Sequence, residues 1–168
     1  MAIHRLNHAV LYVRDVTRSE AFYRDVLGFR TVMSFPGAAF VQAPDSTNDH
    51  DLGLFEIGSQ AGASQAGKAT VGLYHLAWEV DTLNELERLR DVLAGAGSLV
   101  GASDHGSTKS LYAHDPDGLE FEVAWVVPAD QLDDAATKQA AILPLDLEKE
   151  KARYGADTRG GVGISVPA

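Results

Sequence analysis

Two segments of the chain repeat one order of apolar and polar positions. Residues 6–13 are rich in β-branched and aromatic side chains, which is typical of a strand. Apolar positions then recur with helical spacing at Phe22, Val26 and Leu27. The second segment opens with a similar apolar strand at residues 72–80. A second helical stripe follows it, at Leu83, Leu86, Leu89 and Val92 or Leu93. Each segment therefore predicts a strand followed by a helix.

The sequence also predicts where these helices begin and end. Thr17 and Glu20, like Thr82 and Glu85, stand three residues apart, which is the spacing of a capping box. In that motif a hydroxyl and a carboxylate bond the free N–H groups of the first turn. We therefore expect caps at Thr17 and Thr82. Glycines suited to a left-handed stop end the helices, at Gly28 in the first segment and at Gly95 and Gly97 in the second.

After each helix the chain becomes strand-like and is punctuated by glycine. Strands are predicted at residues 29–35, 39–42 and 52–57, and again at 98–101, 110–113 and 119–127. Both segments therefore have the order β-α-β-β-β. The predicted fold is α+β, with one βαβββ module at residues 1–58 and a second at residues 69–127. Residues 59–68 are small and polar, and their composition is that of a flexible linker.

Residues 128–168 form a tail of different texture. Residues 130–141 and 146–154 are charged and rich in Ala and Leu, so we expect two helices separated by Pro144. The Gly-rich end, residues 158–168, is expected to be extended. This tail carries no chemical motif. We expect it to pack on a sheet edge or on a second subunit, which makes a homodimer a plausible assembly.

Composition narrows the classes of partner and of chemistry. The contents of 45% apolar and 23% charged residues are ordinary for a soluble globular protein. We expect a cytoplasmic protein, because the sequence shows neither a signal peptide nor an apolar run of about 18 residues. The net charge of −10 disfavours nucleic acid and anionic membranes as partners. The chain has no cysteine, so a bound metal must use imidazole and carboxylate ligands.

The histidines suggest such a metal site. His8 and His75 occupy equivalent positions in the two repeats, so their imidazoles are candidates to converge on one divalent ion. Nothing near His4 or His114 repeats, and we interpret both as structural. An anionic third ligand is expected on the last strand, where Glu120 and Glu122 share one face by the two-residue period. The alternation of faces along the strand does not decide which of the two glutamates is the ligand.

These residues resemble the vicinal oxygen chelate superfamily, which includes glyoxalase I, bleomycin-resistance proteins and extradiol ring-cleaving dioxygenases. The resemblance covers residues 3–127 and rests on three pieces. They are the strand with His8, the run GLYHLAW at residues 72–78 and the run LYAHDPDGLEFE at residues 111–122. It implies two βαβββ units that form a half-open, barrel-like sheet around a metal. The family's ligating glutamate lies four residues after the glycine of the Asp-Pro-Asp-Gly turn, which implies Glu122.

Two further stretches resemble the extradiol dioxygenases in particular. The run NDHDLGLF at residues 48–55 is similar to their His-Asp-Leu-x-Leu-Phe strand. This similarity implies that His50 lies beside the metal and assists oxygen binding and proton transfer. The run DHGSTKSLY at residues 104–112 is similar to their Asp-His-Gly segment. It implies that His105 lines the substrate pocket and that Tyr112 hydrogen-bonds a substrate oxygen.

The expected activity is therefore a dioxygenase that cleaves a catechol-like aromatic with O2. Two imidazoles and one carboxylate suit Fe(II), with Mn(II) as an alternative. Glyoxalase I carries a second glutamate near the position of Glu56, which we interpret as a strand-end residue. If Glu56 reached the metal, an isomerase or lyase using Ni(II) or Zn(II) would fit better. A metal-free, resistance-type binding protein is a third alternative, but such a protein has no need of three convergent ligands.

Overall fold

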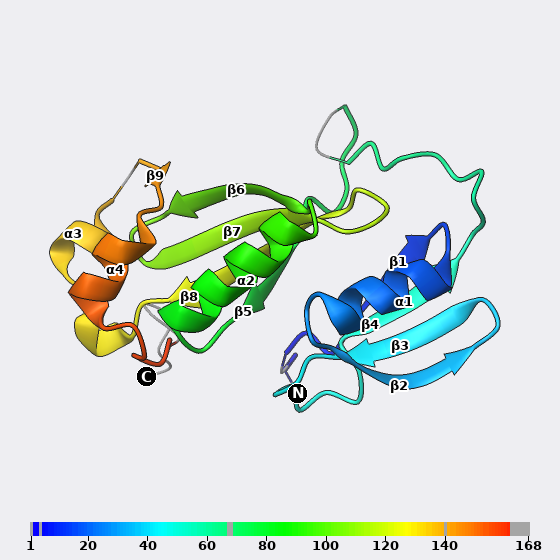
Figure 1. Ribbon diagram of the computed structural model, residues 1–168, viewed down its shortest axis with the longest axis horizontal. Coiled ribbons are helices and arrows are strands. Elements are labelled where there is room, and N and C mark those ends of the chain that lie inside the picture. Colours follow the sequence, from blue (N-terminus) through cyan, green and yellow to red (C-terminus); the bar gives the residue numbers. More distant parts are fainter. Residues whose placement is uncertain (1, 4, 67–68, 140, 162–168) are drawn as a thin grey trace. The chain divides into compact units, whose positions relative to one another are not determined.

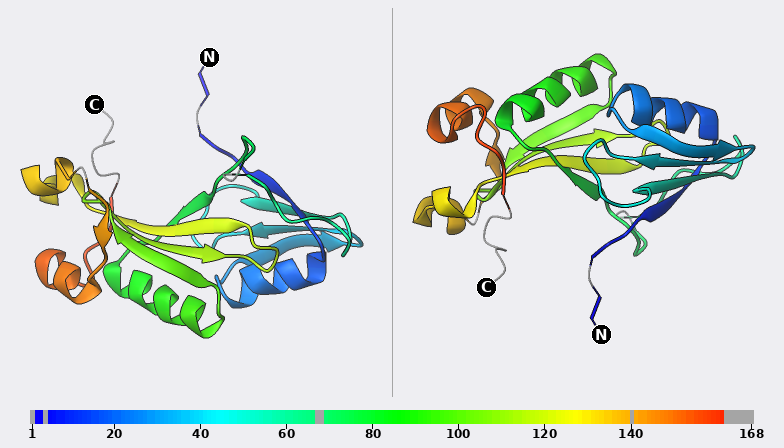
Figure 2. Two further views of the ribbon diagram at one scale, coloured as in Figure 1. Left: turned by 90° about the horizontal axis from the view of Figure 1, so that it is seen from above. Right: turned by 90° about the horizontal axis from the view of Figure 1, so that it is seen from below.

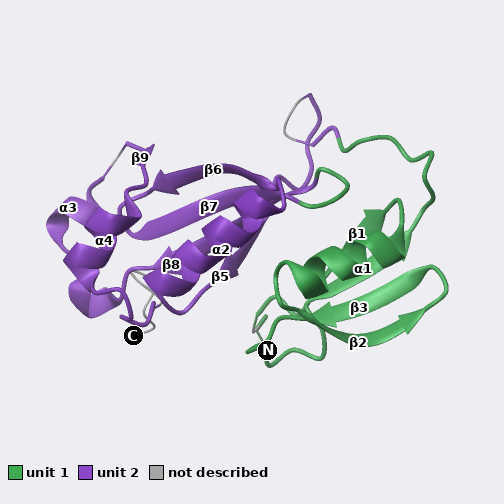
Figure 3. Cartoon of the chain, in the orientation of Figure 1, with its two compact units in different colours: residues 1–64, 115–118 green, residues 65–114, 119–168 purple. Residues whose placement is uncertain are grey.

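The chain folds into two compact units, each described here by itself (Figure 3). The structure is a computed structural model and describes residues 2–3, 5–66, 69–139 and 141–161. Unit 1 comprises residues 1–64 together with 115–118, and unit 2 comprises residues 65–114 and 119–168. His4 and residues 162–168 of the predicted tail lie outside the described residues.

Unit 1 is the first βαβββ module (Figure 1). Its elements are β1 (Ala9–Val13), α1 (Val16–Asp25), β2 (Arg30–Phe35), β3 (Ala38–Gln42) and β4 (Leu52–Glu56). The strand order is β1-β4-β3-β2, with β1 and β4 parallel and the other pairs antiparallel. Helix α1 covers one face of this sheet (Figure 2). The side chains buried in this unit include Leu11, Val13, Val41, Leu52 and Leu54.

Unit 2 repeats that plan and adds the tail. Its elements are β5 (Leu76–Glu79), α2 (Leu83–Gly95), β6 (Leu99–Asp104), β7 (Thr108–His114), β8 (Glu120–Val126), a 3-10 turn (Ala129–Gln131), α3 (Asp134–Thr137), β9 (Leu143–Pro144) and α4 (Leu147–Tyr154). The strand order is β5-β8-β7-β6-β9, and β5 is parallel to β8. Helix α2 packs against this sheet through its apolar stripe, Leu83, Leu86, Leu89 and Leu93.

The predicted α+β fold with two βαβββ modules and a helical tail is confirmed. Each module forms its own mixed sheet, and neither sheet closes into a barrel in the part of the chain described. Both opening strands are shorter than predicted, so His8 and His75 each stand immediately before a strand rather than within it. The equivalence of the two histidines is preserved. No helix among the described residues is long and apolar enough to cross a bilayer.

One of the two predicted caps is correct. Thr82 Oγ1 accepts the Glu85 N–H at 3.1 Å, as expected. The prediction at Thr17 is wrong, because Asp15 accepts the Arg18 N–H at 2.9 Å and starts α1 two residues earlier. Aspartate is a strong N-cap residue, and this earlier start buries Val16 in the first turn. Glu20 instead accepts a hydrogen bond from the Thr31 hydroxyl at 2.6 Å.

The tail is only partly as predicted. Helix α4 matches the expected helix at residues 146–154, and Asp146 caps it by accepting the Lys149 N–H at 3.1 Å. The prediction of a single helix at residues 130–141 is wrong. Asp133 accepts the Ala136 N–H at 2.8 Å, so a new short helix, α3, begins in the middle of that segment. Strand β9 pairs with β6, and the tail therefore packs on the sheet edge.

Candidate functional site

In unit 2 the fold brings His75 against the two glutamates of β8. His75 Nε2 lies 3.1 Å from Glu122 Oε2, and His75 Nδ1 lies 3.6 Å from Glu120 Oε1. Strand β5 runs parallel to β8 with Ala77 opposite Glu122, so His75 is held beside this face. The alternate residues Phe121, Val123 and Trp125 are buried on the other face, as the two-residue period predicted.

The same face of unit 2 carries Tyr112 and His105. Tyr112 is opposite Glu122 in the β7–β8 ladder, and its ring centroid lies 5.9 Å from that of His75. Tyr112 Oη is 2.8 Å from His105 Nε2, so the two side chains share a hydrogen bond. Burial, together with the negative charge of Glu122, raises the pKa of the Tyr112 hydroxyl. Tyr112 therefore remains a protonated phenol at neutral pH and can donate a hydrogen bond.

In unit 1 the fold brings His8 and His50 together. Their ring centroids lie 4.5 Å apart, and Phe40 meets His50 edge-on at 4.9 Å. His8 Nδ1 is 2.8 Å from Asn7 Oδ1. Because that oxygen can only accept, Nδ1 carries the proton and Nε2 keeps its lone pair. This tautomer leaves Nε2 of His8 able to bind a metal ion.

A buried aspartate shapes the loop that carries His50. The Asp51 carboxylate accepts hydrogen bonds from the Ala43 N–H, the Ser46 hydroxyl and the Asn48 side-chain amide, each at 2.8 Å. These bonds close residues 43–51 into a compact loop directly before β4. This role of Asp51 was not predicted from the sequence. The available signal was the run of short polar residues before the strand, since such residues commonly bond nearby backbone.

Glu56 lies far from His8 within unit 1. His8 directly precedes the first residue of β1, whereas Glu56 pairs with Val13, the last residue of β1. Five extended residues separate the two positions, which corresponds to roughly 16 Å. Glu56 Oε2 accepts the Val16 N–H at 3.0 Å, at the first turn of α1. Glu56 is therefore a strand-end residue that supports a helix start, as the sequence was interpreted.

The strand registers show which residue of the first module corresponds to Glu122 of the second, and this residue is not Glu56. In unit 2, Ala77 lies two residues after His75 and pairs with Glu122. In unit 1, Val10 lies two residues after His8 and pairs with Gly53. Gly53 is therefore the counterpart of Glu122. The first module has no carboxylate at that position.

The three predicted ligands are divided between the units, with His8 in unit 1 and both His75 and Glu122 in unit 2. Within neither unit do three or more described His, Asp or Glu side chains form a group that could hold a metal ion. His75 Nδ1 and Glu120 Oε1 are buried without a hydrogen-bond partner among the described residues. On the same face, His75 Nε2 and Glu122 Oε2 lie 3.1 Å apart, and an imidazole nitrogen and a carboxylate oxygen are donors that a divalent cation binds.

The remaining histidines have simpler surroundings. His114 is exposed, and its Nε2 lies 3.7 Å from Glu120 Oε2 at the end of the β7–β8 ladder. The structural role of His114 stays a prediction. Tyr74, next to His75, is also exposed, and the charge of Glu120 and a hydrogen bond to that carboxylate raise the pKa of its hydroxyl.

Comparisons with known proteins identify the family to which this chain is related. The model of the Glyoxalase/Bleomycin resistance protein/Dioxygenase superfamily matches residues 5–123. Biphenyl-2,3-diol 1,2-dioxygenase 3 of Rhodococcus globerulus is 34% identical over 139 residues, which are 80% of this chain and 66% of that protein. Metapyrocatechase 2 of Cupriavidus necator is 33% identical over 119 residues, which are 68% of this chain and 34% of that protein. The chain thus spans between a third and two thirds of the length of these relatives.

Solved structures share the fold. A glyoxylase/bleomycin resistance protein/dioxygenase domain from Frankia sp. EAN1pec superposes with a TM-score of 0.61 at 22% identity, covering 74% of this chain and 93% of that one. The fosfomycin resistance protein FosX of Listeria monocytogenes, in a mutant form complexed with Mn(II), gives a TM-score of 0.55 at 20% identity, with coverages of 73% and 90%. These likenesses show the shared fold. The match of the family model to residues 5–123 establishes that the chain belongs to the Glyoxalase/Bleomycin resistance protein/Dioxygenase superfamily.

Proposed function

We propose that this chain is an extradiol-type dioxygenase that opens a catechol-like aromatic ring with O2, using one divalent metal held by His8, His75 and Glu122. The observation that carries the proposal is the register difference between the modules, with Glu122 in the second and Gly53 in the first. That difference leaves two histidines and a single carboxylate as the donor set. Two histidines and one carboxylate are the facial donor set of non-haem iron oxygenases.

The donor set favours Fe(II), with Mn(II) as the alternative. A bound ion of this kind acts as a Lewis acid, lowers the pKa of a coordinated hydroxyl and leaves positions open for substrate and O2. The chain's part is to orient its donors. Asn7 holds His8 with Nε2 free, and the β5–β8 ladder holds His75 beside Glu122. Such fixed ligand orientation is what raises metal affinity.

The other side chains handle the substrate and its protons. In the proposed reaction the Tyr112 hydroxyl donates a hydrogen bond to a substrate oxygen, and His105 Nε2 fixes the direction of that hydroxyl. His50, stacked against His8, accepts a proton from the substrate hydroxyl and later returns it. A neutral imidazole suits this exchange because its ordinary pKa is close to neutrality.

Aromatic rings beside His50 suit an aromatic substrate. Phe40 and Phe55 meet edge-to-face, with ring centroids 5.8 Å apart. Both rings lie over Gly53, where an added Cβ would come within 3.3 Å of Phe55 and 3.4 Å of Phe40. A side chain at this position would therefore press on the rings. Small-molecule sites are lined mainly by apolar and aromatic groups with a few oriented polar ones, which is the mixture found here.

The same geometry disfavours the alternative of a glyoxalase-type isomerase. That reaction class in this superfamily would need a fourth ligand, and Glu56 lies at the other end of β1 from His8 and accepts the Val16 N–H. A metal-free, resistance-type binding protein would have no need of His8, His75 and Glu122 as convergent ligands.

The test is anaerobic reconstitution of the chain with Fe(II), followed by oxygen uptake with a panel of catechols. We expect oxygen consumption and a coloured ring-opened product. Replacement His50→Ala should slow turnover and leave the iron content unchanged, so loss of iron would refute its proposed role. Turnover of hemithioacetals without oxygen uptake would replace the dioxygenase by an isomerase. High-affinity binding of a small molecule that is independent of metal would favour the binding protein.

A further inference from the structure

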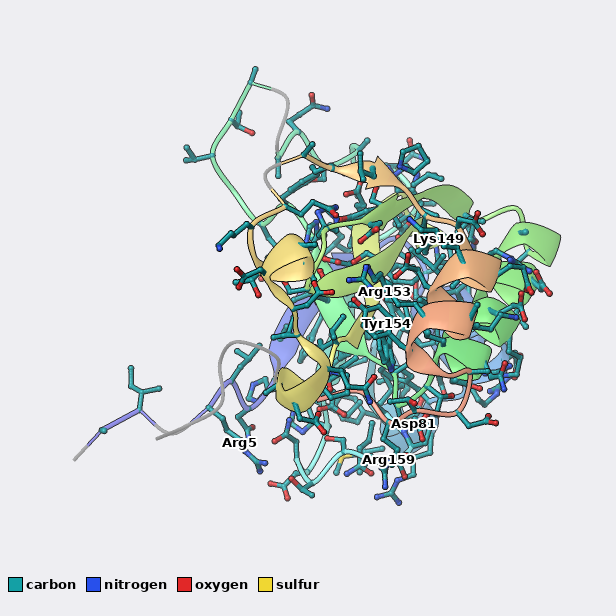
Figure 4. All side chains as sticks on the ribbon, turned by 90° about the vertical axis from the view of Figure 1, so that its left-hand side faces the viewer. Arg5, Asp81, Lys149, Arg153, Tyr154 and Arg159 are labelled. Carbon is teal, nitrogen blue, oxygen red and sulfur yellow. The ribbon has the colours of Figure 1, made fainter. Side chains whose placement is uncertain are left out.

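A buried ion cluster joins the tail to the second sheet. Lys109 of β7 is fully buried, and its Nζ lies 2.5 Å from Asp104 Oδ1 and 3.0 Å from Glu150 Oε2. Glu150 belongs to α4 and is 1% exposed. The Tyr154 ring of the same helix lies 5.6 Å from Lys109 Nζ and closes the cluster on another side. Figure 4 shows α4 with Lys149, Arg153 and Tyr154 labelled along it. The proposed chemistry uses none of these groups.

Asp104 connects this cluster to the turn between β6 and β7. Its Oδ1 also accepts the Gly106 N–H at 2.8 Å, and its main-chain carbonyl accepts Gln139 Nε2 at 2.8 Å. Burial by itself raises the pKa of Asp104, but the hydrogen bonds from Lys109 and Gly106 outweigh burial and lower the pKa below its ordinary value. Asp104 is therefore ionised at neutral pH and bridges the cluster and the turn.

The tail also lies directly against this turn. Gly106 has a φ of +80°, and a Cβ at this position would come 2.2 Å from the Ala136 carbonyl oxygen of α3. Strand β9 pairs Leu143 with Asp104 at the edge of β6. Elements α3, β9 and α4 thus all contact the segment from Asp104 to Lys109.

The turn carries His105 between Asp104 and Gly106. Lys109 and Tyr112 are three residues apart on β7, so their side chains lie on opposite faces of the sheet. Lys109 faces α4, and Tyr112 shares its hydrogen bond with His105 on the other face. A change in the cluster would therefore displace the turn and alter the His105–Tyr112 distance across the sheet.

We propose that the tail positions His105 against Tyr112 through the chain Glu150–Lys109–Asp104, with Glu150 as a positioning residue. The relevance of this geometry to turnover rests on the proposed dioxygenase function, whereas the geometry itself does not. The family model ends at residue 123. The tail therefore lies beyond the part of the chain that the family model matches, and in this proposal it supports His105 within that part.

The first test measures the His105 ring directly, without any need for activity. The full-length chain, loaded with Zn(II), is labelled with 15N-histidine, and the His105 ring signals are compared among variants by NMR. Tyr112→Phe supplies the reference spectrum for a broken hydrogen bond. Glu150→Gln should move the His105 Nε2 signal toward that reference. Glu148→Gln is the matched control, because Glu148 lies on the same helix with its side chain 80% exposed, and it should leave the signal unchanged.

An unmoved His105 signal in folded Glu150→Gln would overturn the proposal, even if that variant were less stable. If Glu150→Gln does not fold, the proposal is tested with Gln139→Ala instead. This variant removes the hydrogen bond that Gln139 Nε2 donates to the Asp104 carbonyl. It should move the same signal in the same direction by a smaller amount. A signal that matches the unmodified chain would refute the tail's role.

A kinetic measurement adds the link to function. With a catechol that the unmodified chain oxidises, Glu150→Gln should lower kcat about tenfold, a part of the roughly 10²–10⁴-fold that a positioned acid–base group contributes. KM should change less than twofold, and Glu150→Asp should restore part of the loss. An unchanged kcat would count against the proposal. Absence of oxygen uptake in the unmodified chain would instead refute the dioxygenase function and leave the NMR result standing.

Discussion

Replacing Lys109 by methionine should strongly destabilise unit 2. The substitution keeps much of the unbranched stem but removes the ammonium group that lies 2.5 Å from Asp104 Oδ1 and 3.0 Å from Glu150 Oε2. Both carboxylates are almost fully buried. Removing one partner of a buried ion pair typically costs about 3–5 kcal/mol, because the remaining charge is left uncompensated. For a chain of this length, about 1 kcal/mol corresponds to roughly 2–4 °C in Tm, so we expect a fall of roughly 6–20 °C.

The assay is thermal unfolding at pH 7, followed by circular dichroism and checked by urea titration. Lys138→Met is the matched control, because Lys138 is 73% exposed and its partner Asp134 is 90% exposed. An exposed pair of this kind contributes about 0–1 kcal/mol, so the control should shift Tm by only a few degrees. If Lys109→Met unfolds within a degree or two of Lys138→Met, the buried cluster does not stabilise the unit and the reasoning is wrong.

Three further predictions concern single carboxylates. Asp51→Ala should lower the free energy of unfolding by about 1–3 kcal/mol, measured in urea, because it removes the acceptor of three hydrogen bonds in the loop before β4. Because the pKa of Asp104 is lowered by folding, the ionised carboxylate stabilises the fold above pH 3.8, its ordinary pKa, and this stabilisation is lost as the pH falls below that value. Asp104→Asn should therefore flatten the acid limb of a Tm–pH curve. An equally steep limb would contradict this prediction. Glu122→Gln should abolish stoichiometric Fe(II) binding in a metal assay while Glu120→Gln keeps it, and the reverse order would reassign the ligand.

Features with a local signature could be predicted from the sequence. The two βαβββ modules follow from apolar periodicity and from the spacing of Thr82 and Glu85, because these report contacts within a few residues. The pairing of Glu120 with Glu122 on one face follows from strand geometry alone. At Thr17 the same reasoning failed, because Asp15 competes for the cap and spacing does not decide between two acceptable caps.

Features that depend on distant elements could not be predicted. Lys109 lies in a strand where a lysine normally indicates an exposed face, and its burial depends on Glu150 of a helix far along the chain. Gly53 can be recognised as the counterpart of Glu122 only once both strand registers are known. Asp51 organises its loop through hydrogen bonds whose partners a linear sequence does not identify.

The most direct test of the proposed activity is the fate of the oxygen atoms. The iron-loaded chain is supplied with 18O2 and a catechol that supports oxygen uptake, and the ring-opened product is analysed by mass spectrometry. A dioxygenase working through His8, His75 and Glu122 incorporates both atoms of one O2 molecule into that product. A product that carries one labelled atom or none would contradict the account.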